Sequence, residues 1–359
     1  MTHSIQGYDI IADIHGCAEK LVALLDKLGY RFDGTAWCHP HRKVIFLGDY
    51  IDRGNEIRET LKIVSSMREK GSAICLMGNH ELNALAWATP DPEHPGEYLR
   101  PHTDKNRRQH AQTLEQLGND YSYWIEWIKT LPLWLDLNPE GIQLHAIHAC
   151  WSDDTMRTVQ EFQVNGQAIL TGAMHAPTLT DTGLHCATKK GHPVFEAIEL
   201  LLKGMEVDLP VGHFMTDKDG HQRTNMRVQW WRQPEGTYQT MAMVSETDRL
   251  GIPALPIYST AFEPIDVPCP TFIGHYWLTA EKPIAPMSER VVCLDYSAVK
   301  GGPLVAYRFN VGEAKLEADH FVVLNEEDFN ADEVRPWVKA KIHDTIEQNQ
   351  TQLSYLKDK

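Results

Sequence analysis

The sequence YDIIADIHG, residues 8–16, passes from an apolar run into a short polar turn. An apolar run of this length that is bounded by a turn is typical of a buried strand. Leucines then recur at positions 21, 24, 25 and 28, the spacing of one helix face, and Gly29 follows as the expected C-cap. This stretch therefore predicts a strand, a polar turn and a helix in succession.

The same unit occurs twice more within the first 85 residues. A second strand is predicted over 44–47 and ends in Gly48 and Asp49, and apolar residues at 57, 61 and 64 predict a helix that ends before Gly71. A third strand is predicted over 73–77 and ends in the sequence GNHE, residues 78–81. Polar side chains thus gather at the C-terminal ends of three successive strands, where α/β proteins build their sites.

The side chains at these strand ends suit metal binding. Asp13 and His15 lie two residues apart, so they point the same way and can hold one ion. Asp49 adds a carboxylate, which can bridge two metals. Asn79 adds an amide oxygen, a hard ligand that brings no further negative charge.

Three blocks carry a resemblance to a known family: DIHG at 13–16, GDYIDRG at 48–54 and GNHE at 78–81. They resemble the signature blocks of calcineurin-like metallophosphoesterases, in particular the phosphoprotein phosphatase branch and its bacterial relatives. The resemblance is strong over residues 8–85. It implies an α/β (α+β) fold in which two mixed β-sheets form a sandwich flanked by helices, with a dimetal site on loops at the strand ends.

The resemblance also implies a ligand set and a cofactor. The first metal would be held by Asp13, His15 and Asp49, and the second by Asp49, Asn79, His148 and His275. The cofactor would be two divalent metal ions, with Mn²⁺ expected first and Fe, Zn, Ni or Co as alternatives.

The two later histidines each have a rival. His148 lies in the sequence IHACW, residues 147–151, at the end of a strand predicted over 142–149, whereas His145 would face the opposite side of that strand. His275 follows the apolar run TFIG, residues 271–274, whereas His213 follows a run that contains Pro210, a residue poorly tolerated inside a central strand. We expect His148 and His275 to be the ligands.

The resemblance implies three further roles. His80 would protonate the leaving oxygen, Asp52 would orient its imidazole, and Arg53 would bind phosphate oxygens, with Asn79 and His80 also contacting the substrate. A metal-bridging hydroxide would attack phosphorus directly. The residues after His275 are Tyr and Trp and not a second histidine, which favours the phosphoprotein phosphatase-like branch. A second substrate arginine remains open among four candidates, Arg100, Arg107, Arg108 and Arg227.

Three functions are consistent with these residues. The first is a phosphatase that hydrolyses phosphomonoesters, with phosphoserine, phosphothreonine or phosphotyrosine in proteins among the substrates considered. The second is a symmetrical dinucleoside-polyphosphate hydrolase, which needs the same metal site and an additional base pocket, for which the polar excursion at 86–134 is available. The third is a binding or scaffold protein without activity, although such a protein would be expected to have lost ligands, and all six candidates are present.

The composition limits the partners. The 34 Lys and Arg against 49 Asp and Glu give a net charge of −15, which argues against binding to nucleic acid duplexes or to anionic membranes. The seven cysteines include no CxxC pair and predict free thiols, and no apolar run reaches a membrane-spanning length, so a cytoplasmic protein is expected. We expect a single domain over 1–359 with an elaboration at about 152–260, and the oligomeric state is not assigned.

Overall fold

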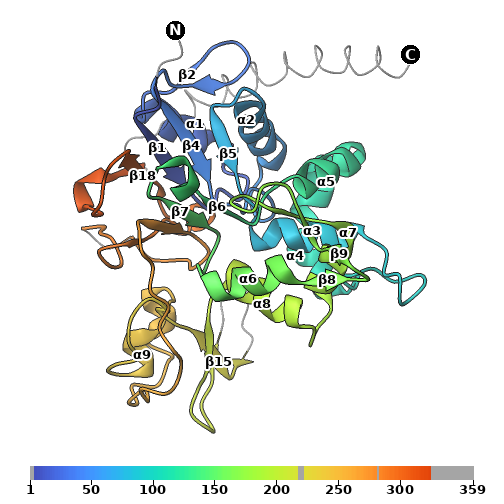
Figure 1. Cartoon of the computed structure of the whole chain (residues 1–359), viewed down its shortest axis with the longest axis vertical. Coiled ribbons are helices and arrows are strands. Elements are labelled where there is room, and N and C mark those ends of the chain that lie inside the picture. Colours follow the sequence, from blue (N-terminus) through green and yellow to red (C-terminus); the bar gives the residue numbers. More distant parts are fainter. Residues whose placement is uncertain (1–3, 217–221, 281–282, 325–359) are drawn as a thin grey trace.

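A computed structural model describes residues 4–216, 222–280 and 283–324 of the chain. Its first sheet is mixed and has the strand order β19-β18-β1-β4-β5 (Figure 1). The strands are β1 (Gly7–Ile11), β4 (Arg42–Phe46), β5 (Ala73–Cys75), β18 (Leu304–Asn310) and β19 (Phe321–Leu324). β1, β4 and β5 are parallel, so their C-terminal ends meet at one edge, as predicted.

The second sheet is also mixed, with the order β17-β16-β7-β6. Its strands are β6 (Trp134–Asp136), β7 (His145–Ile147), β16 (Thr271–Ile273) and β17 (Val291–Cys293). The two sheets pack against each other through aromatic rings: the Phe272 ring on β16 lies 5.2 Å from that of Tyr307 and 5.9 Å from that of Phe309, both on β18. The predicted pair of mixed sheets in one sandwich is confirmed.

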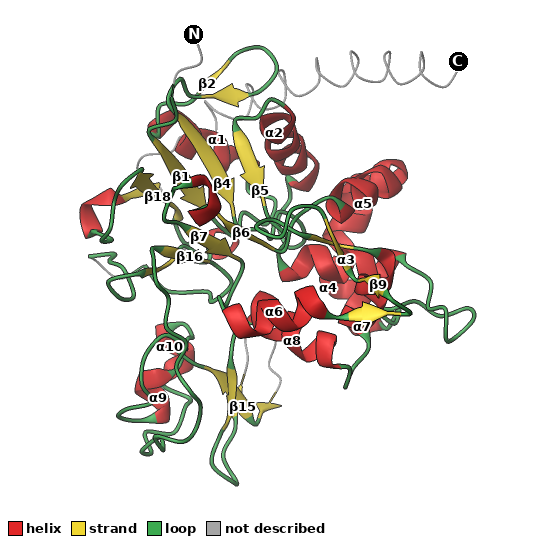
Figure 2. Cartoon of the chain, in the orientation of Figure 1, coloured by secondary structure: helices red, strands yellow, loops and turns green. Residues whose placement is uncertain are grey.

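Helices flank the sheets (Figure 2). They are α1 (Ala18–Lys27), α2 (Ile57–Glu69), α3 (Asn79–Ala88), α4 (Asp104–Leu117), α5 (Tyr121–Lys129), α6 (Asp153–Glu161), α7 (Asp181–Thr188), α8 (Pro193–Lys203), α9 (Tyr238–Met241) and α10 (Glu246–Arg249). The predicted first helix buries Leu21, Leu24 and Leu25, and Gly29 follows it with a φ of +89°, a conformation that glycine adopts without strain.

Helix α5 ends at Lys129, although apolar side chains continue at helix-compatible spacing as far as Trp134. Pro132 disfavours helical geometry at the residue before it, so the chain leaves the helix there. Leu131 and Trp134 are still buried, because the extended chain of β6 returns Trp134 to the same core opposite Ile147.

The segment from about 152 to 260 combines helices α6–α10 with short two-stranded ribbons. Its small strands are β8 (Gln163–Val164), β9 (Gln167–Ala168), β10 (Leu170–Thr171), β11 (Thr178–Leu179), β12 (Glu206–Asp208), β13 (Met215–Thr216), β14 (Gln222–Arg223) and β15 (Asn225–Arg227). Outside this segment, β2 (Arg31–Phe32) and β3 (Trp37–Cys38) form a further ribbon. Residues 205–262 carry their own apolar group, which we call the second apolar cluster: Val207, Leu209, Met215, Met226, Val228, Tyr238, Met241, Ala242, Ile252 and Ile257. This part projects away from the two sheets around β15 and α9 (Figure 1). The division of the chain into domains stays a prediction.

Two further observations bear on the sequence analysis. All seven cysteines lie in described residues and are free thiols, as predicted. Among the described helices, none has the length and apolar character needed to cross a bilayer.

Candidate active site

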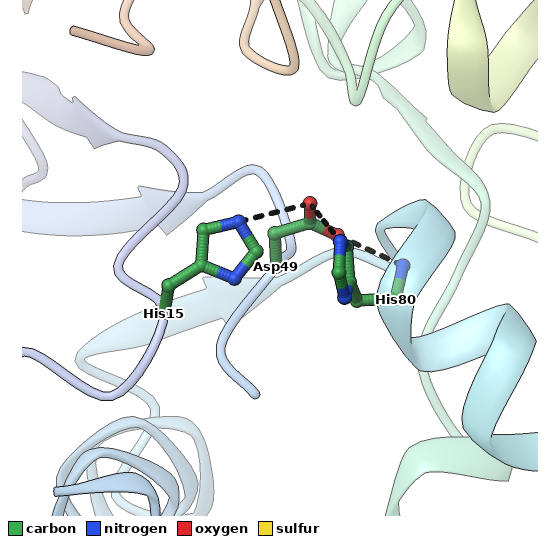
Figure 3. A group of neighbouring side chains, drawn as sticks. All are labelled: His15, Asp49 and His80. Carbon is green, nitrogen blue, oxygen red and sulfur yellow. Dashed lines mark hydrogen bonds and ion pairs between the residues drawn. The ribbon is translucent and has the colours of Figure 1, made fainter. Parts of the chain in front are cut away.

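The turns that follow β1, β4 and β5 meet around the carboxylate of Asp49. Asp49 Oδ2 lies 3.4 Å from His15 Nε2, 3.5 Å from His148 Nε2 and 3.9 Å from His80 Nε2. Figure 3 shows His15 and His80 on either side of this carboxylate. Asp49 is 2% exposed, so these contacts form in an environment with little water.

A second group of polar side chains shares His148 Nε2 with Asp49. Asn79 Oδ1 is 3.1 Å from His148 Nε2 and 2.8 Å from His275 Nδ1. Asp13 adjoins the same group, because its Oδ2 accepts a hydrogen bond of 2.9 Å from the backbone N–H of His275. At this site the histidine and carboxylate ligand atoms form two sets, each lying within 4.8 Å of one another: His15, Asp49 and His80, and Asp49, His148 and His275. Asp49 belongs to both sets.

Backbone carbonyls orient two of the imidazoles. The Nδ1–H of His15 donates to the Ile51 carbonyl over 2.7 Å, and the Nδ1–H of His148 donates to the Leu47 carbonyl over 2.8 Å. A carbonyl only accepts, so each neutral ring carries its proton on Nδ1 and turns the lone pair of Nε2 toward Asp49. This tautomer leaves Nε2 free to bind a metal ion.

The donor set fits divalent cations. Asp13 Oδ1 and His15 Nε2 are buried and have no hydrogen-bond partner in the described structure. Burying such groups without a partner costs free energy that a bound cation would offset. Carboxylate, imidazole and amide oxygen are the ligand types that divalent transition metals accept together.

Burial and neighbouring charges shift the pKa values of several side chains in this site. Burial, the neighbouring Asp295 and Asp49 raise the pKa of Asp13 well above its usual value. Burial lowers the pKa of His15 to about 3. Burial would also lower the pKa of His148, but the Asp49 carboxylate outweighs it and raises that pKa to about 10. Clustered shifts of this size are typical of functional sites.

Glu81 holds the turns together. Its carboxylate accepts hydrogen bonds from three backbone N–H groups, of Asp49 at 2.7 Å, Tyr50 at 2.9 Å and Gly78 at 3.0 Å. Gly48 must be glycine here, because a Cβ would lie 2.3 Å from the Gly78 nitrogen. This close approach of two backbones sets Asp49 beside α3, whose His80 N–H donates to Asp49 Oδ1 over 3.0 Å.

The three residues with expected roles beside the metals lie next to this group. His80 Nδ1 is 2.6 Å from Asp52 Oδ2. Arg53 is exposed, and its guanidinium lies 4.2 Å from the ring centroid of Trp277. Arg53 adds its charge to the factors that act on the pKa of His15, after burial and Asp49. The structure thus brings together all nine residues singled out in the sequence.

The rival histidines lie elsewhere. His145 is buried and stacks on Trp151 with ring centroids 3.7 Å apart, and its Nε2 is 2.8 Å from Asn138 Nδ2. His213 is exposed on a turn. Neither belongs to the two sets of ligand atoms.

The four arginines differ in their surroundings. After burial, the Arg227 guanidinium is the next cause that holds the pKa of His275 well below its usual value. Burial lowers the pKa of Arg100, and the charge of Asp52 opposes this. Arg107 lies over the Trp87 ring at 5.6 Å, and Arg108 is exposed. Arg227 and Arg100 are therefore the two whose charges act on residues of the site.

Sequence reasoning assigned no role to several residues that the site uses. Asp52 Oδ1 accepts hydrogen bonds from His110 Nδ1 at 2.7 Å and from Thr113 Oγ1 at 2.5 Å. The signal was weak: these residues lie three apart in a segment expected only to be partly helical. Glu81 lies inside the GNHE block, where a carboxylate next to two ligand-bearing turns could have been read as their support.

The chain is similar in sequence to known proteins of one family. The family model described as calcineurin-like phosphoesterase matches residues 8–214. The chain is 42% identical over 74 residues to an asymmetrical bis(5'-nucleosyl)-tetraphosphatase of Halalkalibacterium halodurans, which covers 20% of this chain and 30% of that protein. It is 27% identical over 155 residues to a symmetrical bis(5'-nucleosyl)-tetraphosphatase of Marinomonas sp., which covers 42% of this chain and 48% of that protein. The matches thus span less than half the length of either relative.

A solved structure is also similar. A cold-active protein-tyrosine phosphatase of a psychrophilic Shewanella aligns with a TM-score of 0.43 and 16% identity, over 90% of this chain and 83% of that one.

Proposed function

Because this chain belongs to the calcineurin-like phosphoesterase family, we propose that it is a two-metal-dependent phosphatase that hydrolyses phosphomonoesters. One observation carries the proposal: Asp49 Oδ2 lies 3.4 and 3.5 Å from the Nε2 atoms of His15 and His148, while buried His15 Nε2 has no hydrogen-bond partner among the described residues. The proposed ligands are Asp13, His15 and Asp49 for one ion and Asp49, Asn79, His148 and His275 for the other. Mn²⁺ is the first ion to test.

The proposed chemistry divides between the ions and the protein. Two divalent ions, when bound, supply positive charge that polarises the phosphoryl group and makes water more acidic. Asp49 belongs to both sets of ligand atoms and Asn79 Oδ1 lies beside His148 and His275, so these two residues would contribute ligands to both ions of one site. His80 is oriented by Asp52 through Nδ1, which leaves its Nε2 to donate a proton to the departing oxygen.

Arg53 is the proposed phosphate ligand of the protein. Among the described residues its guanidinium forms no hydrogen bond or ion pair, and Trp277 covers one side of it. A planar guanidinium presents two parallel N–H donors to phosphate oxygens, which a lysine cannot reproduce. Arg53 is thus available for substrate and already oriented.

A second candidate, hydrolysis of dinucleoside polyphosphates, is favoured by two observations. The relatives described above are named bis(5'-nucleosyl)-tetraphosphatases. In addition, Lys300 Nζ lies 5.4 Å from the Trp277 ring, so a second exposed cation and an aromatic ring adjoin Arg53. Such a group suits a leaving group that carries further phosphates and a base.

One experiment decides between the two. Manganese-loaded protein is given an equimolar mixture of a phosphopeptide, p-nitrophenyl phosphate and diadenosine tetraphosphate, and every product is quantified over time, with Asp49→Asn as the control. Preferential release of inorganic phosphate from the monoesters would support a phosphomonoesterase. Dominant formation of ADP would support the symmetrical dinucleotide activity, and formation of ATP with AMP the asymmetrical one. No metal-dependent product from any substrate would refute both candidate functions.

A further inference from the structure

The Asp52 carboxylate is shared between two elements of the protein. Its Oδ2 lies 2.6 Å from His80 Nδ1 on α3, and its Oδ1 accepts from His110 Nδ1 and Thr113 Oγ1 on α4 at 2.7 and 2.5 Å. Asp52, His110 and Thr113 are 3, 5 and 0% exposed, so water does not compete for these bonds. Both oxygens of one buried carboxylate are therefore fixed by neighbouring side chains.

His110 and Thr113 are themselves held in place. Thr113 Oγ1 also accepts the backbone N–H of Asp52 over 2.9 Å, so one hydroxyl binds both the main chain and the side chain of the same residue. His110 Nε2 lies 2.9 Å from the Tyr121 hydroxyl, which fixes the far side of the ring. A carboxylate only accepts, so His110 carries a proton on Nδ1 and donates it to Asp52.

One face of α4 extends this contact along the whole turn after Asp49. Gln116, three residues beyond Thr113, accepts the Ile57 N–H at 2.8 Å through Oε1 and donates to the Gly54 carbonyl at 2.8 Å through Nε2. Residues three apart on a helix lie on the same face, so His110, Thr113 and Gln116 form one row against residues 52–57.

This turn needs such support. Asp52 and Arg53 have φ values of +65° and +71°, a left-handed conformation that costs a non-glycine residue free energy. A strained turn keeps its shape only where the surrounding structure determines it. The row on α4 supplies hydrogen bonds at three points of the turn.

We propose that His110 and Thr113 are positioning residues that hold the Asp52 carboxylate so that His80 Nε2 points at the leaving-group oxygen. The proposal rests on the proposed function, in which His80 is the general acid. Neither residue contacts a proposed metal ligand, and both act on substrate only through Asp52 and His80. A role in stability alone would tie α4 to the turn without affecting the direction of the His80 ring.

The test compares variants that keep or remove each hydrogen bond. His110→Asn retains an N–H donor near the position of Nδ1, whereas His110→Leu removes it, and Thr113→Ser and Thr113→Val form the matching pair. Glu115→Gln, at an exposed position of the same helix, is the control. All variants are first compared with the wild type by thermal unfolding.

Two measurements follow. The first is kcat for phosphoserine, an alkyl phosphate, and for p-nitrophenyl phosphate, whose leaving group needs no proton. We expect His110→Leu and Thr113→Val to lose about 10- to 100-fold on the alkyl phosphate and only a few-fold on the aryl phosphate, with His110→Asn and Thr113→Ser close to wild type. The second is the downfield proton NMR signal of His80 Nδ1–H, assigned by its absence in His80→Ala, which we expect to shift or broaden in His110→Leu and to stay unchanged in Glu115→Gln.

The outcomes separate the two proposals. An unchanged His80 signal in His110→Leu, or equal losses on both substrates that follow the loss of thermal stability, would overturn the positioning role. Wild-type protein that hydrolyses no phosphoester would instead overturn the proposed function, and the NMR signal would still decide whether His110 and Thr113 orient His80.

Discussion

Two regions of the molecule differ in where their backbones are strained. One is the set of turns after β1, β4 and β5, and the other is the segment of the second apolar cluster. In the turns, Asp13, His15 and Asp49 have positive φ and are buried, with φ values of +49°, +46° and +56°. Over the described residues of 204–262, positive φ occurs only at glycines, and large apolar side chains such as Leu250 and Tyr258 are exposed. Backbone strain is thus concentrated in the turns of the candidate active site. In the other region, positive φ is confined to glycines, which adopt it without strain.

The largest effect is expected from Asp49→Asn. Asp49 belongs to both sets of ligand atoms, and the amide carries no charge to hold two cations. We expect metal-dependent turnover to fall by about a thousand-fold or more, which corresponds to at least about 4 kcal/mol in the barrier. Metal content by mass spectrometry and circular dichroism would be measured alongside kcat. A variant that is folded, binds two ions and remains active would refute the assignment of Asp49 as a ligand of both ions.

The next prediction compares His275, a histidine of the candidate site that follows β16, with His213, which lies in the segment of the second apolar cluster. His275→Ala removes a nitrogen that lies 2.8 Å from Asn79 Oδ1, whereas His213→Ala changes an exposed turn. We expect kcat/KM to fall about a hundred-fold or more for the first, as when a metal ligand or its support is lost, and to stay near wild type for the second. Reversed effects would make His213 the ligand and would place the second ion in a different part of the protein.

Arg53→Lys should have a moderate effect. The lysine keeps the charge but loses the planar pair of donors and the stacking on Trp277. We expect kcat/KM to fall about ten-fold, mainly through KM, which steady-state kinetics on p-nitrophenyl phosphate would measure. An unchanged KM would show that the guanidinium does not bind the phosphate.

The smallest effect on activity is expected from Met241→Ala. Met241 is fully buried in the second apolar cluster, so the cavity should lower the free energy of unfolding of that region by about 2–5 kcal/mol. Val211→Ala, at an exposed site in the same region, should change it by less than about 0.5 kcal/mol. Denaturant unfolding and kcat would be measured together, and kcat is expected to stay near wild type for both. A large loss of activity in Met241→Ala would show that the cluster is coupled to the site.

The first 85 residues were predictable because their signals are local. Each strand, turn and helix is contiguous in the sequence, so the ends of β1, β4 and β5 could be placed together from the parallel order alone. The end of α5 has a weaker local signal. Apolar residues continue at helical spacing past Lys129, and Pro132 is the residue that indicates that the helix stops.

The support of Asp52 could not be predicted in the same way. His110 and Thr113 are about 60 residues away in sequence, and their contact with Asp52 depends on where α4 packs, which the local pattern does not state. The second apolar cluster could not be predicted either, because its strands have only two or three residues, which is too short for an alternating pattern to identify a strand. Contacts that depend on the packing of distant elements are what the sequence alone left open.

The left-handed residues of the candidate site affect which substitutions can raise the thermal stability of this protein. Of the nine described non-glycine residues with positive φ, seven belong to or adjoin the candidate site: Asp13, His15, Asp49, Asp52, Arg53, His275 and Trp277. Glycine adopts positive φ without this strain, so we expect some glycine substitutions at these positions to raise thermal stability while they remove a proposed ligand. A library screened for thermal stability alone would therefore be expected to include inactive variants among its stabilised members.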